Sequence, residues 1–488
     1  MSDNEKATVV FTRSHLSKED EYGRLSNVGS VEIPNGLCYL AAVTRAAGYN
    51  TKIIDAHALN IANERLAERI VEDGADYVGI SANTINIYSA ADLAERLKKA
   101  KPGITVIVGG PHITAVPEET MERFPHIDIG VIGEGEDTII ELLETLEKGG
   151  DLKKVKGIIF RDGGKLVVTE KRPFITDLDR LPPPAFDLLP ELKTYYKPPA
   201  WSLHAKTSAL MITSRGCPSQ CTFCDRAVFG NVCRAHSAEY VMNLVRDLYY
   251  NYGVRHLRLN EDNLLIFRKR LEEICNAIID EKLDLSWSCF ARVDFVDEDI
   301  LRLMKRAGCW QISYGIESGE QRILDEEKKH LKLEQIERAV RLTKRFGIRV
   351  VGFNMIAHPL ETVESMKKTI DFNKRIGVDD FKAEFLIPFP GTEIYHTADK
   401  YGTLDRDWRK MGVYKGPVFV PNGLTEELLE EWSMRGMWQF YLQPRVILSY
   451  LSQVRGPNDL KTLFMGGSVV FSILLDSMRS KVGEGVAS

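Results

Sequence analysis

Three cysteines stand close together at positions 217, 221 and 224, in the segment Cys217-Pro-Ser-Gln-Cys221-Thr-Phe-Cys224. Thiolates are ligands that both zinc and iron–sulfur clusters favour. A cubane 4Fe–4S cluster normally takes four cysteines, so three of them would leave one iron without a protein ligand. A cofactor or a substrate can coordinate at such an iron. We therefore predict that Cys217, Cys221 and Cys224 bind a 4Fe–4S cluster with one open position.

Two other interpretations of the cysteines stay open. Zinc is the main alternative metal, because three cysteines and a water molecule suit it. The cluster is favoured because the loop follows the first strand of a predicted barrel, which zinc ribbons lack. Cys233 is a further candidate ligand, although eight residues separate it from Cys224. The remaining four cysteines stand in apolar surroundings and are expected to be inert core residues: Cys38, Cys275, Cys289 and Cys309.

Composition and charge exclude several classes of protein. The chain has 488 residues, of which 44% are hydrophobic, enough for a large core. Its 64 basic and 69 acidic residues give a net charge of −5, so nucleic-acid binding is not expected. Eight cysteines in this length argue against a disulfide scaffold and for a reducing compartment. No signal peptide is visible, and the longest apolar run, residues 463–475, falls short of the ~20 residues of a membrane span. We expect a cytoplasmic enzyme without a transmembrane segment.

The first part of the chain, residues 1–150, alternates short β-rich runs with helical patterns. Strands are expected at residues 8–12, 51–55, 76–81, 104–109 and 127–132. Helices such as residues 37–47 and 90–101 lie between them. This alternation predicts an α/β domain with a doubly wound parallel sheet. Ligands of such a sheet bind beyond the carboxyl ends of the strands.

A second alternating series follows a break in composition. Residues 151–204 are expected to form a β-hairpin, at 157–169, and a stiff proline-rich linker. Residues 205–395 are predicted to form a partial TIM-like (β/α)6 barrel, with its active site at the carboxyl ends of the strands. The predicted barrel strands are residues 210–214, 256–260, 286–291, 312–316, 350–356 and 382–387, and helices are expected at 238–250 and 333–346. Residues 396–488 should form a helical C-terminal region.

The Cys-x3-Cys-x2-Cys spacing, with Phe223 before the last cysteine and six βα units around it, resembles the radical S-adenosylmethionine (SAM) superfamily. The resemblance extends over residues 205–395. It implies that the open iron binds the amino and carboxylate groups of SAM. It also implies that an electron from the reduced cluster cleaves SAM to methionine and a 5′-deoxyadenosyl radical.

The same resemblance assigns residues at the ends of the later barrel strands to SAM. The loop after the second strand lacks the family's Gly-Gly-Glu, so the contact with the SAM amino group is assigned by position, to Glu261 and Asp262. Arg292 is expected to pair with the SAM carboxylate, or alternatively with Asp294. Glu317 belongs to a motif similar to the family's ribose-binding motif, although an ordinary exposed carboxylate is the alternative. The full set of expected SAM contacts is Phe223, Glu261, Asp262, Arg292, Glu317, Ser318 and Asn354.

A doubly wound domain that precedes such a barrel resembles the cobalamin-binding domain of the cobalamin-dependent radical SAM enzymes. The expected cobalamin contacts are Ser81, Asn83, Thr84, Gly109, Gly110, Pro111, His112, Gly133, Glu134 and Gly135. A Rossmann dinucleotide site is the alternative, but its Gly-x-Gly-x-x-Gly motif is absent after the first strand. The Asp-x-His-x-x-Gly signature of other cobalamin proteins is also missing. The lower face of the cobalt is therefore expected to have a water ligand or none.

Together the two resemblances imply methylation of an unactivated carbon in a hydrophobic or complex small molecule. Oxidative cyclisation or rearrangement without methyl transfer is the alternative, since the layout also resembles the branch that contains the anaerobic magnesium-protoporphyrin monomethyl ester cyclase. A redox-sensing protein that binds cobalamin and an iron–sulfur cluster is a second alternative. The expected partners are a lipid-like or tetrapyrrole-like substrate and an electron donor such as flavodoxin or ferredoxin.

An apolar, helical C-terminal segment adds one further expectation. It contains Trp432, Met437, Trp438, Phe440 and Tyr441, residues 446–451, and the run at 463–475. This spacing favours core that closes the barrel. A wall for a hydrophobic substrate, or a contact with a membrane surface, is the alternative.

Overall fold

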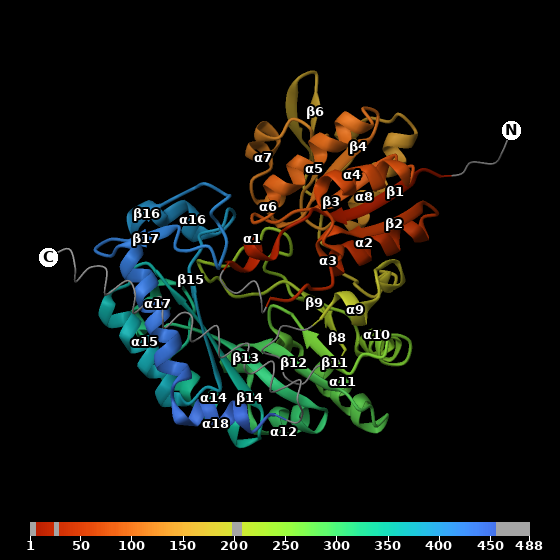
Figure 1. Cartoon of the computed structure of the whole chain (residues 1–488). Helices are drawn as coiled ribbons and strands as arrows, with labels where there is room; N and C mark the ends of the chain where they lie inside the picture. The colour runs from red at the N-terminus through yellow and green to blue at the C-terminus, as the bar shows by residue number, and fades with distance from the viewer. Residues whose placement is uncertain (1–5, 24–28, 198–206, 455–488) are drawn as a thin grey trace.

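The computed structural model describes residues 6–23, 29–197 and 207–454. Figure 1 shows two α/β units, the first in red to orange and the second in green to cyan, with the last segments of the chain in blue beside both. Each unit is built on its own sheet, so the predicted α/β fold class is confirmed.

The first unit contains a seven-stranded sheet with the order β2-β1-β3-β4-β5-β6-β7. Strands β1 to β5 are parallel to one another, and β6 and β7 form an antiparallel hairpin. The strands are β1 (Thr8–Arg13), β2 (Asn50–Asp55), β3 (Tyr77–Ser81), β4 (Thr105–Gly109), β5 (Ile129–Val131), β6 (Ile158–Asp162) and β7 (Lys165–Val168). The hairpin expected at 157–169 therefore forms, but it extends the first sheet instead of standing apart with the linker.

Helices cover both faces of this sheet, as a doubly wound sheet requires. Along β1, Val9 and Phe11 pack on the side of α2 and α8, while Val10 packs on the side of α4 and α5. The helices of the unit are α1 (Lys18–Tyr22), α2 (Asn35–Ala46), α3 (Ala56–Leu59), α4 (Asn63–Glu72), α5 (Ile87–Ala100), α6 (Pro111–Ala115), α7 (Pro117–Arg123) and α8 (Glu136–Glu147).

The linker packs against the first unit. Ile175, Leu178 and Leu181 form a small apolar cluster with Tyr39 of α2. Further along, the hydroxyl of Tyr196 lies 2.7 Å from the carboxylate of Asp55 at the end of β2. The short helical segments in this part are η2 (Leu152–Lys154), η3 (Phe186–Leu188) and α9 (Leu192–Tyr195).

The second unit contains six parallel strands in the order β15-β14-β13-β12-β11-β8. The strands are β8 (Ser208–Met211), β11 (His256–Leu259), β12 (Ser286–Ala291), β13 (Cys309–Glu317), β14 (Arg349–Ile356) and β15 (Asp380–Phe385). Because β8 and β15 are the two edges of the sheet, the barrel is partial, as predicted.

Helices alternate with these strands. Their ends follow local chemistry: α15 begins where the Thr362 hydroxyl accepts the Ser365 N–H, and it ends at Gly377, whose φ is 78°. The elements are α10 (Ala238–Tyr250), η4 (Leu264–Phe267), α11 (Arg268–Asp280), η5 (Val293–Phe295), α12 (Glu298–Arg306), α13 (Gln321–Glu326), α14 (Leu333–Arg345) and α15 (Val363–Ile376).

The C-terminal region contacts both units. Trp408 and Phe419 are buried in the core that α5 and β4 line, and α17 packs on α15 and β15. Its elements are α16 (Glu393–Thr397), η6 (Ala398–Lys400), β16 (Gly402–Leu404), β17 (Phe419–Pro421), α17 (Glu426–Tyr441) and α18 (Pro444–Leu451). The region expected to be helical thus also contains a short antiparallel hairpin.

The described part of the apolar C-terminal segment has both buried and exposed apolar side chains. Trp432 and Phe440 are buried, as core that closes the barrel requires. Leu448 and Leu451 of α18 are exposed. The run at 463–475 lies outside the described residues. Among the helices that the structure describes, none has the length and apolar character needed to cross a membrane.

Candidate functional site

The three candidate cluster ligands lie in one loop at the carboxyl end of β8. The loop runs between two short paired strands, β9 (Ser214–Arg215) and β10 (Arg234–Ala235). Cys221 is buried, Cys217 is half-buried and Cys224 is exposed, and none of them is in a disulfide. We call residues 216–233 the cysteine loop.

The backbone of the cysteine loop is anchored on both sides. Gly216 has a φ of +85°, and a Cβ there would lie 2.4 Å from the carbonyl oxygen of Val232, so only glycine fits without strain. The N–H of Thr222 donates to the carbonyl oxygen of Glu327 at 3.2 Å. The cysteines are therefore held on a loop with fixed ends.

The surroundings of the loop favour a thiolate at Cys221, whereas the hydrogen bond to Cys221 and burial raise the pKa of Cys224. A hydrogen bond from the thiol of Cys224, together with the positive charges of Lys329 and Arg292, lowers the pKa of Cys221 to about 6. The thiolate is the form that binds metal. Within the described ranges, no three or more His, Cys, Asp or Glu side chains are grouped around a position for a single metal ion. An iron–sulfur cube binds each thiolate through a different iron, so this donor set fits a cluster.

A buried ion pair lies beside the loop. Nζ of Lys329 lies 2.7 Å from Oε1 of Glu317, and both side chains are below 10% exposed. The same ammonium group lies 5.7 Å from the centre of the Phe223 ring. The expected SAM residue Glu317 is therefore buried and paired, which excludes the alternative of an ordinary exposed carboxylate.

Sequence reasoning missed Lys329, although the backbone around it is unusual. Its neighbours Lys328 and His330 have φ values of 53° and 54°, and Glu317 has a φ of 65°. Backbone of this kind costs free energy in residues other than glycine and gathers at functional sites. The run Lys328-Lys329-His330 carries no such signal in the sequence, where it resembles a solvated charged turn.

Arg292 pairs with Asp294, the alternative to the SAM carboxylate. Its Nε and Nη2 atoms each lie 3.1 Å from the carboxylate of Asp294, and Nη2 also donates to the carbonyl oxygen of Lys329 at 3.2 Å. The guanidinium thus braces the segment that carries Lys329. Its charge acts on Cys221 from that position.

Glu261 and Asp262, the two expected SAM contacts in the loop after β11, differ in their surroundings. The carboxylate of Glu261 is buried and accepts hydrogen bonds from the backbone and hydroxyl of Thr213, from the Ser214 hydroxyl at 2.6 Å and from Arg270 at 3.3 Å. It therefore ties this loop to the first barrel strand. Asp262 is exposed and accepts a hydrogen bond from the Gly216 N–H.

Asn263, two residues after Glu261, is the group in this loop that sequence reasoning overlooked. It is 3% exposed, and neither its amide nitrogen nor its amide oxygen has a hydrogen-bond partner in the described structure. A buried amide without partners costs free energy unless a ligand or a water completes it. Asn263 therefore fits a position beside a polar ligand.

The other two expected SAM residues connect strands to α15. The hydroxyl of Ser318 lies 3.3 Å from that of Thr369. The side-chain oxygen of Asn354 accepts the amide of Asn373 at 2.7 Å. Both residues are buried at the carboxyl ends of β13 and β14, where the sequence placed them.

His358 lies in the turn that follows β14. It is fully buried, and Nδ1 contacts the carboxylate of Glu327. Burial acts to lower the pKa of His358, but the carboxylate of Glu327 outweighs it and raises that pKa to about 9. The carbonyl oxygen of Glu327 accepts a hydrogen bond from the N–H of Thr222, so the His358–Glu327 pair is connected to the cysteine loop through the backbone of Glu327.

The expected cobalamin residues all follow strands of the first sheet at its carboxyl edge. Ser81 and Gly109 end β3 and β4, Pro111 begins α6, and Asn83 accepts two backbone N–H groups of its own turn. Gly110 has a φ of +111°, and a Cβ there would lie 2.5 Å from the carbonyl oxygen of Ala82. The backbone here can therefore approach its neighbour only because the residue is glycine.

His112 is buried against this turn. Its Nδ1 lies 3.0 Å from the hydroxyl of Thr84, and its ring meets the edge of Trp408 at 4.3 Å between centres. Burial, with the nearby charge of Arg123, lowers the pKa of His112 to about 3, so the imidazole is neutral. Nε2 has no partner in the described structure, which leaves one buried nitrogen available to a ligand.

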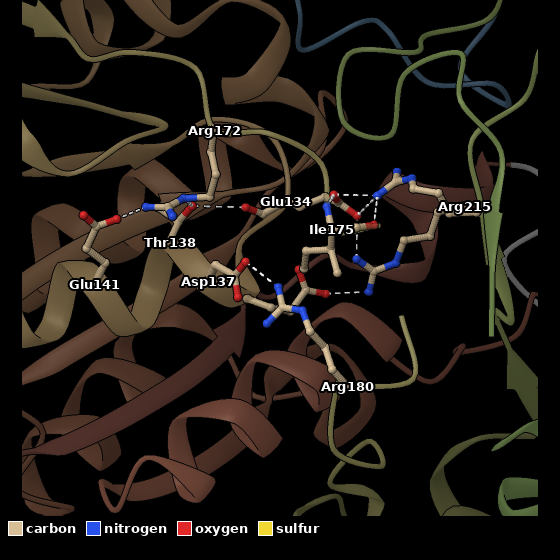
Figure 2. Close-up of polar contacts among 10 residues, drawn as sticks. Glu134, Asp137, Thr138, Glu141, Arg172, Ile175, Arg180 and Arg215 are labelled. Carbon is tan, nitrogen blue, oxygen red and sulfur yellow. Dashed lines mark hydrogen bonds and ion pairs between the residues drawn. The ribbon is translucent and has the colours of Figure 1, made fainter. Parts of the chain in front are cut away.

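Glu134, in the loop after β5, is engaged within the protein. Figure 2 shows its carboxylate facing Arg215 and the N–H of Ile175, which lie 2.7 Å and 2.9 Å from it. Its neighbour Gly133 has a φ of +85° and no atom within 4 Å of where a Cβ would stand, whereas Gly135 faces Leu40. The carboxylate of Glu134 is therefore paired with Arg215 and with the linker. The part of this loop with open space beside its backbone is Gly133.

The carboxyl edges of the two sheets face each other. Glu134, after β5, contacts Arg215, after β8. At Gly391, after β15, an added Cβ would lie 2.9 Å both from Ala115 of α6, after β4, and from Asp225 of the cysteine loop. A ligand bound at either edge would therefore lie close to one bound at the other.

Two family models match the chain. A B12 binding domain matches residues 23–143, and the radical SAM superfamily matches residues 211–372. Both matches fall on the units whose carboxyl edges face each other.

Relatives and solved structures extend over most of the chain. "Uncharacterized methyltransferase PH0819" of Pyrococcus horikoshii is 35% identical and aligns over 88% of this chain and 92% of its own length. The anaerobic magnesium-protoporphyrin IX monomethyl ester cyclase of Rubrivivax gelatinosus is 28% identical, over 86% of this chain and 75% of the cyclase. The fold is similar to that of OxsB, a cobalamin-dependent S-adenosylmethionine radical enzyme, with a TM-score of 0.73 at 18% identity, over 96% of this chain and 72% of OxsB.

Proposed function

Since the chain belongs to the cobalamin-dependent radical SAM enzymes, we propose that it methylates an unactivated carbon of a hydrophobic or complex small molecule. The observation that carries the proposal is the approach of the two carboxyl edges, where Arg215 at the base of the cysteine loop pairs with Glu134 after β5, and Gly391 lies between Asp225 of the loop and Ala115 of α6. When bound, the cluster supplies the electron that cleaves SAM to a 5′-deoxyadenosyl radical, and cobalamin supplies the methyl group. The protein binds both cofactors and excludes water between them.

In this proposal Cys217, Cys221 and Cys224 hold the cluster. Lys329 and Arg292 stabilise the thiolate of Cys221 by their charge. Phe223 lies under the ammonium group of Lys329, on the same loop as the cysteines.

The residues proposed for SAM divide into two groups. Asp262, and the free amide of Asn263, are proposed to contact the cofactor from the loop after β11. The side chains of Glu261, Arg292, Glu317, Ser318 and Asn354 are engaged within the protein, and we propose that they hold the strand ends to which SAM binds.

For cobalamin, we propose that the backbone around Gly109, Gly110 and Gly133 lies against the ring and its tail. Ser81 and Asn83 stand beside this backbone, and His112 offers its free Nε2. Glu134 is proposed to fix the loop and not to contact the cofactor with its side chain, because that side chain is fully paired.

Cyclisation or rearrangement without methyl transfer remains a second candidate, because the chain is also 28% identical to the cyclase of Rubrivivax gelatinosus. Both relatives carry the names of enzymes, which favours an enzyme over the redox-sensing alternative. We propose flavodoxin or ferredoxin as electron donor, a substrate with lipid-like or tetrapyrrole-like apolar surface, and a cytoplasmic setting that keeps the eight free cysteines reduced.

The test uses oxygen-free protein reconstituted with iron, sulfide and cobalamin, then given dithionite and SAM labelled in its methyl group. The proposal expects 5′-deoxyadenosine and S-adenosylhomocysteine in the wild type, and neither product in Cys221→Ala. Formation of 5′-deoxyadenosine without S-adenosylhomocysteine, with candidate substrates present, would favour the cyclase reading. Absence of 5′-deoxyadenosine from fully loaded protein would refute both.

A further inference from the structure

A group of buried ion pairs joins the first unit to the base of the cysteine loop (Figure 2). Nη1 of Arg215 lies 2.7 Å from Glu134, and Nη2 of the same residue lies 2.6 Å from Glu136. Arg234 lies 2.7 Å from the other oxygen of Glu134. The four side chains are only 3–8% exposed. We call these four residues the interdomain ion cluster.

Both arginines belong to the base of the cysteine loop. Arg215 and Arg234 are paired residues of the two-stranded ribbon β9–β10, which encloses the loop. Cys217 follows Arg215 by two residues. A shift of either guanidinium would therefore move the chain that carries the cysteines.

Both acids belong to the loop proposed to face cobalamin. Glu134 stands between Gly133 and Gly135, and Glu136 begins α8. The carboxylate of Glu134 also accepts the N–H of Ile175 at 2.9 Å, while Arg234 donates to the carbonyl oxygen of Ile175 at 2.8 Å. The linker is thereby included in the same set of contacts.

The surroundings of the interdomain ion cluster restrict how its two guanidinium groups can be oriented. Two guanidiniums balance two carboxylates, and aromatic rings flank the cations: Arg215 lies 5.4 Å from the ring centre of Phe229, and Arg234 lies 4.7 Å from that of Phe174. Arg215 uses its two Nη atoms on two different carboxylates, and a planar guanidinium held in this way is fixed in orientation as well as in distance. A buried ion pair adds little net stability over apolar packing, so its role in fixing geometry is the better physical explanation.

We propose that the interdomain ion cluster is a positioning device that sets the distance between the iron–sulfur cluster and cobalamin. The inference rests on the proposed function, because it requires both cofactors. Reactions between bound groups depend steeply on placement, and a misplacement of about 1 Å can cost about 100-fold in rate. The four residues need not touch either cofactor to exert this control.

The experiment measures the spacing itself. Wild-type protein and Glu134→Gln, each loaded with cobalamin and the cluster, are reduced without oxygen and frozen. EPR then records the spin–spin coupling between cob(II)alamin and the reduced cluster. We expect a resolved splitting in the wild type and its loss or broadening in Glu134→Gln. An unchanged splitting in a variant that retains both cofactors overturns the proposal.

Asp137→Asn is the matched control. Asp137 lies next to Glu136 on α8 and pairs with Arg180 of the linker at 2.5 Å, but both side chains are more than a third exposed and neither reaches the cysteine loop. We expect its splitting to equal that of the wild type. A splitting lost equally in Asp137→Asn would show that any change of charge on α8 has this effect, and would also overturn the proposal.

Glu136→Gln keeps the test decisive if Glu134→Gln does not fold. It removes one of the two carboxylates on Arg215 and leaves Glu134 between the two arginines. We expect a partial broadening of the splitting. A wild-type protein that binds no cobalamin or no cluster would refute the proposed function, whereas loaded variants with unchanged coupling would refute this inference alone.

Discussion

The ammonium group of Lys329 lies 2.7 Å from the carboxylate of Glu317, and the pair is buried next to Phe223 of the cysteine loop. Gly315 explains part of this proximity, because a Cβ there would lie 2.3 Å from the Glu317 carboxylate and 2.8 Å from Lys329. The end of β13 and the segment between α13 and α14 thus place a buried ion pair beside the loop that carries the candidate cluster ligands.

Removal of that cation should destabilise the protein. In Lys329→Met the carboxylate of Glu317 would be buried without a partner, which costs about 3–5 kcal/mol when one member of such a pair is lost. Thermal unfolding of the apoprotein measures the loss. The neighbouring Lys328→Met is the control, because its pair with Glu393 is about 40% exposed on both sides and should contribute at most about 1 kcal/mol. Equal effects of the two substitutions would contradict the account.

Individual cysteine substitutions should separate ligands from bystanders. Cys217→Ala, Cys221→Ala and Cys224→Ala are each expected to lose most of the cluster. Cys233→Ala should keep it, because the Cys233 thiol donates to the carbonyl oxygen of Gly216. Iron and sulfide content after reconstitution measure the outcome. Cluster loss in Cys233→Ala equal to that in the other three would make Cys233 a fourth ligand and close the open iron.

Because of His358, the free energy of unfolding should decrease as the pH becomes alkaline. The pKa of His358 is about 9 in the fold, against 6.5 for the free side chain, so its pairing with Glu327 stabilises the fold fully below pH 6.5. That stability is lost as the pH rises from 6.5 to about 9. The full effect is roughly 3 kcal/mol at 1.36 kcal/mol for each unit of pKa. Glu361 also faces His358, and burial raises its pKa.

Denaturant unfolding of the wild type and of His358→Gln, from pH 6 to 9.5, compares the imidazole with a side chain that does not titrate in this range. The difference in unfolding free energy should narrow as the pH rises. A constant difference across this range would show that the imidazole does not change its charge there.

Gly110→Ala should weaken cobalamin binding. Its φ of +111° is strained for alanine, and the new Cβ would press on the carbonyl oxygen of Ala82, so we expect a loss of about 1–3 kcal/mol in stability. Titration with cobalamin, followed by absorbance, measures the affinity. Gly103→Ala is the control, since no atom lies within 4 Å of its Cβ position and its φ is not in the left-handed region. Unchanged affinity in Gly110→Ala would remove this turn from the cobalamin site.

The elements of the fold could be predicted because they depend on local patterns. The strand at residues 286–291 and the helix at 238–250 have the expected bounds. The hairpin at 157–169 was expected, but its attachment to β5 was not, because strand pairing depends on a partner elsewhere in the chain.

The site could be predicted only where spacing carries the information. The three cysteines share one short motif, whereas Glu134 and Arg215 are 81 residues apart and nothing local shows that they pair. Lys329 was missed because the left-handed backbone of its neighbours Lys328 and His330 is visible only in the structure. Asn263 was missed because the signal is a buried amide without partners, which is a property of packing.

EPR of the reduced cluster with and without SAM tests the central claim most directly. The account predicts that oxygen-free protein shows a 4Fe–4S signal whose shape changes when SAM is added, because SAM occupies the iron that the three cysteines leave free. A missing cluster, a signal indifferent to SAM, or a signal that survives replacement of Cys217, Cys221 and Cys224 together by alanine would contradict it.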